Sequence, residues 1–531
     1  MRIWGSWLLA LAVVAPGFGA EPTYWGEIRP LLRKHCTVCH SERHRDDFDV
    51  SAGLVLDTPE AIRAGGQSGK VPVVTPGKGA SSLLVTILRE KNPKRRMPLD
   101  ADPLSDADAD LLRRWIDAGL PLGTPPAVTA MATPGTTPRR LRKRDVTFTT
   151  KMPVPKKLAP TPAMLAMKLP IGPLAPVTAV NFSIDGKRLA VGSYGRVVIW
   201  DTTTGQPIQT LTNLLGAVND LRFSPDGTLL AIAGGQPSAR GEIRLVSTAD
   251  WKPKGTLGGH LDTVAAVAFH PKGAQLASVS FDRTVRLWDL ATMQVQRVMK
   301  DHSDSVHAVA YDPQGTVLVT ASKDRTLRLW DLTTGKSKLT LSGMEQDVLA
   351  VTVSGDGQRI FSSGMEPQMH VWNAQTGERI GKVAGHSISV DEIARSATAE
   401  VIASVGADQT LRLWNPKTGA ATKSIPLESR AYAVGVSPDG TLAAVGGVDG
   451  TVRLVKLAES RVLLTLVMVP AAEKLGWLSW TPEGYIAADE PVWGQVTWLA
   501  GSTAVAGESL GYLRSPERLR DAWQGKPVKA P

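Results

Sequence analysis

A repeat of about 42 residues runs through most of the chain and narrows the folds that it can adopt. Trp288, Trp330, Trp372 and Trp414 follow one another at intervals of 42 residues. Each closes a short run such as TVRLW, rich in β-branched and apolar residues, and turns containing Gly or Asp separate these runs. A repeat of this length predicts one small antiparallel sheet per repeat, with neighbouring sheets packed together to bury their faces.

The segments VNFSIDGKRLAVGSYGRVVIWD, VAFHPKGAQLASVSFDRTVRLWD and VAYDPQGTVLVTASKDRTLRLWD resemble the WD-repeat family. The resemblance implies an all-β propeller over residues 163–505. Seven repeats are clear, and an eighth, LSWTPEGYIAADEPVWGQVTWLAG, is degraded, with Trp498 lying 43 residues after Val455. Seven or eight blades are both compatible with the spacing, which slightly favours eight. LAMKLPIG, residues 165–172, is expected to supply the missing outer strand and close the ring.

Four residue types recur at fixed offsets within three of the repeats and look like catalytic triads. One enzyme needs one nucleophile, whereas each blade of a propeller needs a buried network that ties its outer loop to its inner strands. We therefore predict a structural role for these sets. They are His260, Ser278, Asp282 and Trp288; His302, Thr320, Asp324 and Trp330; and His386, Ser404, Asp408 and Trp414.

The first 20 residues, MRIWGSWLLALAVVAPGFGA, predict a secretory signal peptide. A basic residue at the start is followed by a short apolar run and by small residues at the exit. An uncleaved anchor is the alternative, and no later window is long and apolar enough to span a membrane. We expect an exported protein, in the periplasm of a bacterium.

Residues 123–162 are predicted to be a linker, because they are rich in Pro, Thr, Ala and positive charge. Eight Lys and Arg residues lie between Gly123 and Pro160 against Asp145 alone, so this segment supplies most of the net charge of +10. The basic balance therefore predicts a solvated linker, or contact with an anionic surface, rather than a nucleic-acid-binding face.

Both cysteines of the chain lie three positions apart, and a histidine follows them directly in Cys36-Thr-Val-Cys39-His40. This spacing is typical of covalent haem c attachment. Two thiols bond to the two vinyl groups on one porphyrin edge, and the next residue then places its imidazole under the iron. We predict one covalently attached haem, with thioethers at Cys36 and Cys39 and with His40 as an axial iron ligand.

Three other interpretations of the motif are weaker. A redox-active pair is expected at a helix start in a βαβ context, and none is visible. A zinc site needs four ligands, and His35, His40 and His44 crowd the cysteines too closely for a good tetrahedron. A disulfide between Cys36 and Cys39 would close a very short loop and stabilise little.

The second axial ligand is predicted to be Met97, in the loop KRRMPLD, 57 residues after His40. Water and His44 are the alternatives, but His44 is only four residues from His40 and would hardly reach the opposite haem face. Ligation by His and Met raises the reduction potential, because a thioether favours ferrous iron. A helix follows the loop, in LSDADADLLRRWIDAGLP, with Ser105 as its N-cap.

The order of CTVCHS, RMPLD and LLRRWIDAGLP resembles the class I cytochromes c. It more closely resembles the exported cytochrome c domain of planctomycete-type bacterial proteins, which is often fused to other modules, WD repeats among them. The resemblance implies a small all-α cytochrome c domain over residues 21–122. The expected chain is therefore multidomain, with this domain, the linker, the propeller and a C-terminal tail over residues 506–531.

We expect an electron-transfer and binding protein rather than a catalyst. Its haem would carry single electrons, and its propeller would bind a protein ligand. Basic residues flank the haem-binding segments and predict an acidic redox partner: Arg33, Lys34, Arg43, Arg45, Lys94, Arg95 and Arg96. A haem-based sensor or scaffold is the first alternative. A propeller enzyme that uses the cytochrome domain as its electron acceptor is the second.

Overall fold

The computed structural model separates the chain into two compact units, Met1–Leu141 and Arg142–Pro531. The residues that the structure describes are 21–28, 31–32, 56, 62, 73–90, 97, 104–122, 146–153, 164–169, 174–470, 475–500, 503–505 and 507–529. Cys36, Cys39 and His40 lie outside them, as do the signal segment and the basic residues predicted to surround the haem.

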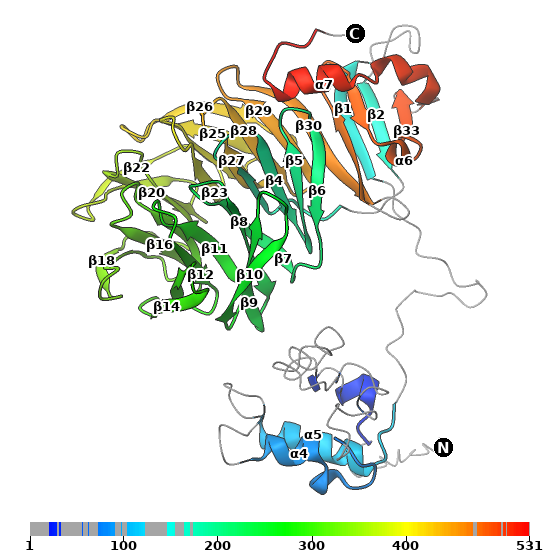
Figure 1. Ribbon diagram of the computed structural model, residues 1–531, viewed down its shortest axis with the longest axis vertical. Coiled ribbons are helices and arrows are strands. Elements are labelled where there is room, and N and C mark those ends of the chain that lie inside the picture. Colours follow the sequence, from blue (N-terminus) through cyan, green and yellow to red (C-terminus); the bar gives the residue numbers. More distant parts are fainter. Residues whose placement is uncertain are drawn as a thin grey trace, which may run out of the picture. The chain divides into compact units, whose positions relative to one another are not determined.

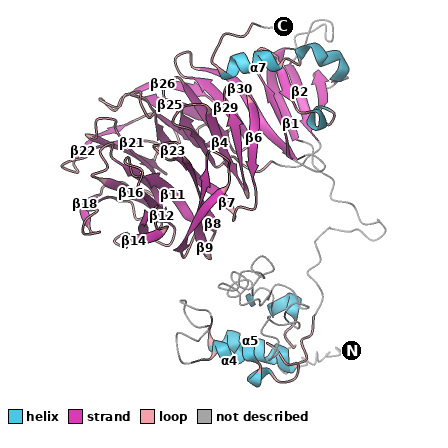
Figure 2. Cartoon of the chain, viewed as in Figure 1, coloured by secondary structure: helices cyan, strands magenta, loops and turns pink. Residues whose placement is uncertain are grey.

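The described elements of the first unit are all helical (Figure 2). They are η1 (Tyr24–Ile28), η3 (Gly79–Ser81), α4 (Leu83–Leu88) and α5 (Asp106–Asp117). Helix α5 confirms the predicted start, because the Ser105 hydroxyl accepts a hydrogen bond from the Asp108 N–H at 3.1 Å. Asp106 and Asp108 lie in the first turn, where carboxylates favour the positive end of the helix dipole.

One apolar cluster forms the core of this unit. Trp115 on α5 is fully buried, its indole N–H donates to the Pro121 carbonyl at 3.1 Å, and its ring centroid lies 6.1 Å from that of Tyr24. The helix is joined to η3 by the Asp117 carboxylate, which accepts the Gly79 N–H at 2.6 Å. Short helices of this kind depend on such packing, since isolated they are marginal in water.

The second unit contains seven four-stranded antiparallel repeats, each built from consecutive strands (Figure 1). The first three blades comprise β3 (Ala179–Phe182), β4 (Arg188–Ser193), β5 (Arg196–Asp201), β6 (Gln206–Leu211), β7 (Ala217–Phe223), β8 (Leu229–Gln236), β9 (Arg240–Ser247), β10 (Pro253–His260), β11 (Val264–Phe269), β12 (Gln275–Ser280), β13 (Val285–Asp289) and β14 (Gln294–Met299). The next two comprise β15 (Val306–Tyr311), β16 (Leu318–Ser322), β17 (Leu327–Trp330), β18 (Ser337–Leu341), β19 (Val348–Val353), β20 (Arg359–Gly364), β21 (Met369–Asn373) and β22 (Arg379–Val383). The last two comprise β23 (Val390–Arg395), β24 (Ile402–Gly406), β25 (Thr410–Trp414), β26 (Ala421–Pro426), β27 (Ala431–Val436), β28 (Leu442–Gly447), β29 (Thr451–Lys456) and β30 (Arg461–Pro470).

The ring closes with seven blades, not with the eight that the spacing slightly favoured. The first strand of each blade packs against the first strand of the next, and β27 packs against β3. The degraded eighth repeat does not enter this ring. Its strands β31 (Leu475–Trp480) and β32 (Ile486–Ala488) pair instead beyond β30, so the seventh blade becomes a six-stranded sheet.

A further four-stranded sheet lies outside the ring, in the order β1-β2-β33-β34. Strand β2 (Met164–Leu169) pairs with β33 (Thr497–Ala500), Met167 opposite Trp498, so the outer strand expected near residue 165 is present but completes no blade. Strand β1 (Val146–Pro153) comes from the segment expected to be a linker, and β34 (Thr503–Val505) pairs with β33. The short helix α6 (Glu490–Trp493) packs against β31.

The last described residues pack onto the propeller rather than forming a free tail. They contain η4 (Gly507–Leu513) and α7 (Pro516–Trp523), which lies along β30 (Figure 1). Leu519, Ala522 and Trp523 are buried in one cluster with residues of both the first and the seventh blade. The amphipathic helix therefore covers the seam at which the ring closes.

Candidate functional site

Met97 is the one predicted haem-binding residue that the structure describes. Its side chain is half-buried and packs against the apolar core of the first unit, and its backbone N–H donates to the Ile87 carbonyl at the end of α4, at 3.1 Å. A thioether held at the edge of an apolar core suits an axial ligand of haem iron, because burial and axial-ligand identity are the means by which a protein tunes that iron. Met97 therefore fits the predicted role.

The rest of the predicted haem site lies outside the described residues, so its geometry stays a prediction. Among the described residues, no three His, Cys, Asp or Glu side chains gather in a way that could hold a metal ion. None of the described helices has the length and apolarity needed to cross a membrane.

The three recurring sets in the propeller form the predicted buried networks. In the third blade, the Trp288 indole N–H donates to the Ser278 hydroxyl at 2.7 Å, and that hydroxyl lies 2.8 Å from His260 Nε2. His260 Nδ1 lies 2.8 Å from the Asp282 carboxylate, which can only accept, so Nδ1 carries the proton. The sets around Trp330 and Trp414 repeat this arrangement with distances of 2.7–2.9 Å.

Burial and hydrogen bonding act against each other on the acidic group of each set. Burial alone would raise the pKa of Asp282, but hydrogen bonds from His260, Thr284 and the Leu261 backbone hold that pKa below its usual range. Burial lowers the pKa of His260. The hydrogen bond to Asp282 and the negative charge of that carboxylate raise it, but they offset only part of the effect of burial. The network thus contains a neutral imidazole and a charged carboxylate at neutral pH, as a structural tie requires.

The fifth blade carries a variant network that the sequence patterns did not reveal. Met344 occupies the histidine position, and the Ser362 hydroxyl lies 3.8 Å from its sulfur. The Trp372 indole N–H still donates to Ser362, at 2.9 Å. Glu366 replaces the aspartate and accepts the Glu345 N–H at 2.5 Å, so the loop remains tied. The 42-residue spacing from His302 to Met344 was the available signal.

The networks lie near one face of the propeller, where several large apolar side chains are exposed. We name this the docking face: it is formed by the turns between second and third strands and by the connections between blades. Leu261 follows His260, and the Asp282 carboxylate accepts its backbone N–H at 2.9 Å while its side chain is 66% exposed. The other large exposed apolar residues of this face are Tyr194, Met365, Ile388 and Val448.

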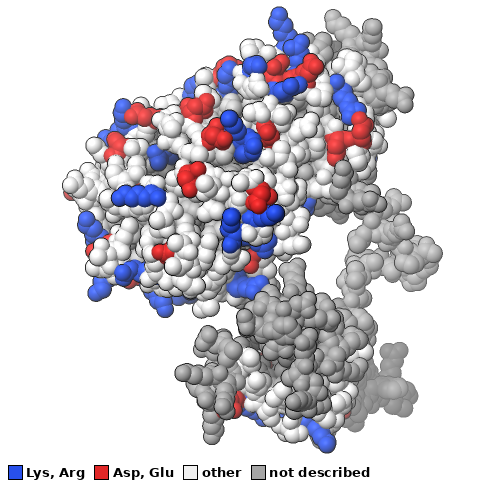
Figure 3. All heavy atoms as spheres, viewed as in Figure 1, with Lys and Arg blue, Asp and Glu red and all other residues white. Residues whose placement is uncertain are grey.

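Charge is mixed on the part of the second unit that Figure 3 shows. Lys and Arg alternate there with Asp and Glu, and the visible face of the described residues has no continuous basic stripe. A nucleic-acid-binding face would need such a stripe.

Ser404→Ala tests whether the networks are structural. Removal of the hydroxyl leaves the Trp414 indole N–H and His386 Nε2 without partners in the interior. We expect the free energy of unfolding of the propeller to fall by about 1–3 kcal/mol, measured by chemical denaturation. Ser424→Ala, on the exposed outer strand β26, should change it by less than about 0.5 kcal/mol. Equal effects of the two substitutions would contradict a structural role.

Seven blades closed into a ring, three of them with a His-Ser/Thr-Asp-Trp network, define the second unit as a WD-repeat β-propeller. The family model for the WD domain, G-beta repeat, matches at residues 169–201, 205–245, 251–289, 293–331, 335–373, 377–415 and 427–456. The model for Planctomycete cytochrome C matches residues 36–100. The chain is thus a fusion of a planctomycete cytochrome c domain with seven WD repeats, as the sequence motifs predicted.

Individual relatives match short stretches of the chain. The Target of rapamycin complex subunit wat1 of Schizosaccharomyces pombe is 38% identical over 98 residues, which cover 18% of this chain and 30% of that protein. An uncharacterized WD repeat-containing protein of Synechocystis sp. is 35% identical over 118 residues, 22% of this chain and 32% of its own. WD repeat and SOCS box-containing protein 1 of Xenopus tropicalis is 34% identical over 115 residues, which cover 21% of this chain and 26% of that protein. The match spans about a third or less of each relative, so their names carry no function over to this chain.

Proposed function

We propose that this protein is an exported c-type cytochrome whose WD-repeat propeller serves as a protein-binding platform. One haem, attached through Cys36 and Cys39 and ligated by His40 and Met97, carries single electrons. The covalent bonds keep the cofactor from being lost outside the cell. The propeller brings a redox partner, with an acidic surface, close to that haem.

One observation carries this proposal. The planctomycete cytochrome match spans residues 36–100, so the two thiols, the histidine and the methionine all belong to one module. The half-buried position of Met97 against the apolar core of that unit supports its role as the sixth ligand. A closed site with two protein ligands favours electron transfer over gas binding, because no position on the iron is left for a ligand.

The propeller supports the binding half of the proposal. Its docking face exposes Tyr194, Leu261, Met365, Ile388 and Val448, and the buried networks fix the loops that present some of them. Rigid loops lose little conformational entropy on binding, which favours a specific protein partner. A propeller fold by itself names no activity, so the assignment depends on this surface.

Met97→Ala tests the proposed ligand set. In the oxidised wild type, we expect the weak charge-transfer band that a methionine–iron bond gives at the red end of the visible spectrum. The variant should lose this band while keeping its covalent haem, and its reduction potential should fall because the thioether no longer favours ferrous iron. The measurement is an optical spectrum of the purified exported protein, with a redox titration of the same sample.

Met131→Ala is the matched control, because Met131 lies in the segment predicted to be a linker. It should leave the band and the potential unchanged. Ready carbon monoxide binding by the reduced wild type would overturn the electron-transfer assignment and favour a haem-based sensor, since it requires an open or labile sixth position.

A further inference from the structure

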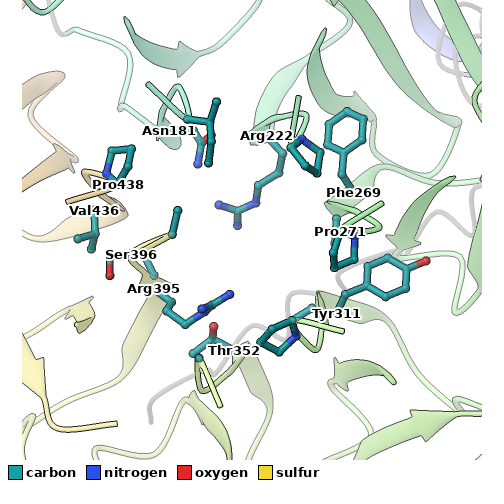
Figure 4. Close-up of a pocket in the computed structure, with 18 of the residues that line it drawn as sticks. Asn181, Arg222, Phe269, Pro271, Tyr311, Thr352, Arg395, Ser396, Val436 and Pro438 are labelled. Atoms are coloured by element: carbon teal, nitrogen blue, oxygen red, sulfur yellow. The ribbon is translucent and has the colours of Figure 1, made fainter. Parts of the chain in front are cut away.

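The central channel of the propeller opens into a pocket on the face opposite the docking face. The turns between the first and second strands of the blades surround it, and its volume is about 750 Å³. Figure 4 shows Arg222 and Arg395 directed into this pocket, with Asn181 and Thr352 on the walls. Both labelled side chains that reach toward the centre are thus guanidinium groups, which can only donate hydrogen bonds.

Arg395 breaks the pattern of the repeat. It is the last residue of the first strand of the sixth blade, β23. The same position in the other six blades is aromatic or apolar: Phe182, Phe223, Phe269, Tyr311, Val353 and Val436. At this position the repeat normally places an apolar side chain that serves packing. A single charged residue there indicates a local function rather than a structural need.

The second arginine of the channel is already compensated. Arg222 Nη2 lies 3.3 Å from the Asp220 carboxylate and 3.8 Å from that of Glu392. Both carboxylates also accept a backbone N–H from the next blade, Asp220 from Val267 at 2.9 Å and Glu392 from Val434 at 2.7 Å. Asp220 and Glu392 stand where the other five blades carry alanine, so this cluster is also specific to two blades.

Arg395 has no such compensation. Within the part of the chain that the structure describes, no carboxylate lies within ion-pair distance of its guanidinium, although the group is half-buried and burial lowers its pKa. The three acidic residues on the pocket wall are engaged elsewhere. Asp312 accepts the Val317 N–H at 2.6 Å, Asp356 accepts the Gln358 N–H at 3.0 Å, and Glu400 pairs with Lys417 at 2.9 Å. A half-buried cation without a counter-ion is costly, and an anionic ligand would remove that cost.

We propose that this pocket binds a carboxylate, which forms a two-pronged ion pair with the Arg395 guanidinium. The planar fork of arginine matches the two oxygens of a carboxylate, and the partly desolvated site strengthens the pair. Prolines and aromatic rings from neighbouring blades, Pro271, Tyr311 and Pro438 among them, supply apolar walls for the carbon atoms of the ligand. The carboxylate comes either from a small free acid or from an acidic side chain of a protein loop that enters the channel.

Calorimetric titration of the full-length protein at low salt tests this site with defined probes. The probes are succinate, a short blocked peptide with one glutamate, and the same peptide with glutamine. Arg395→Val installs the residue that the fifth and seventh blades carry at this position, and Arg395→Gln removes the charge with a smaller change of packing. Lys252→Gln removes a positive charge from an exposed side chain away from the pocket.

We expect one ligand per chain, weakened about tenfold or more by either Arg395 substitution and unaffected by Lys252→Gln. If only succinate binds, the ligand is a small acid. If the glutamate peptide binds and the glutamine peptide does not, the ligand is an acidic side chain of a protein. The proposal is overturned if neither acidic probe binds at millimolar concentration, if the glutamine peptide binds equally well, or if both Arg395 variants bind as the wild type does. Haem content and spectrum are independent of all these outcomes.

Discussion

Replacing both cysteines, Cys36→Ala with Cys39→Ala, is expected to abolish covalent haem in the exported protein. The two thioethers are the proposed bonds between protein and porphyrin, and the chain has no other cysteine. Wild-type protein that is fully denatured and extracted with acidic organic solvent should keep its colour. The double variant should be colourless after the same treatment, and a haem stain of a denaturing gel should show the same difference.

Each partial variant has its own expected result. Cys36→Ala or Cys39→Ala alone leaves one thioether, so some pigment should stay attached. Met97→Ala removes only the proposed sixth ligand and should keep the full amount of covalent haem, which separates attachment from ligation. Pigment that leaves the denatured wild type, or that was never present, would contradict the proposed cytochrome function. The propeller and its carboxylate pocket would stand unchanged by that result.

Trp523→Ala is expected to lower the free energy of unfolding of the propeller by about 3–5 kcal/mol, as the loss of a large buried ring does elsewhere. The Trp523 side chain is 1% exposed, and its ring stacks on that of Trp200 with centroids 6.0 Å apart. Trp200 has the same position in its blade as the tryptophans of the buried networks. In those networks a Ser or Thr ten residues earlier accepts the indole N–H, but the residue ten positions before Trp200 is Ala190, which has no hydroxyl. Its ring is held by stacking instead.

The position of the helix explains why this loss should be large. In a ring of seven separate blades, the first and last blades meet without sharing a strand. The seam therefore depends on side-chain packing and on isolated hydrogen bonds, such as that from the Val177 N–H to the Gly447 carbonyl at 3.1 Å. Helix α7 joins the two sides: the Lys456 ammonium of the seventh blade donates to the Gly525 carbonyl at 2.8 Å, and the Gln524 amide reaches the Thr203 carbonyl of the first blade at 3.4 Å. Gly205 leaves room for the indole, because a Cβ there would lie 2.4 Å from Trp523.

Chemical denaturation followed by circular dichroism measures the change in stability, and amide hydrogen exchange locates it. Exchange should become faster in β3 and β30, on the two sides of the seam, before it does in blades three to five. Arg520→Ala, on the exposed side of the same helix, should change stability by less than about 0.5 kcal/mol. A Trp523→Ala variant as stable as Arg520→Ala would show that the seam does not need the helix.

Local features were predicted well from the sequence. The N-cap of α5 at Ser105 and the three buried networks depend on residues a few positions apart or at a fixed repeat spacing, and the structure confirms both. The segment near residue 165 is a strand, as expected, but it pairs with β33 outside the ring and does not close it. The haem-binding residues, Met97 among them, stay a prediction from the Cys-x-x-Cys-His pattern and from the methionine that follows it.

The number of blades could not be obtained in the same way. Counting tryptophans treats Trp498 as the mark of an eighth blade, but a blade also needs an inner strand that faces the channel. The structure instead adds β31 and β32 to the edge of the seventh sheet. Likewise, the segment 506–531 was expected to be a tail, and only the cluster around Trp523 shows that its apolar residues cover the seam.

The sequence by itself determined the modules of this protein: the Cys-x-x-Cys-His motif, the repeat and the buried networks all arise from chemistry between residues at short or regular spacing. Only the tertiary structure decided which blades meet, what covers their junction, and that Arg222 from β7 and Arg395 from β23 point into one pocket. The physical reason is that ring closure and the channel bring together residues far apart in the chain, and a periodic pattern contains no information on where its ends join.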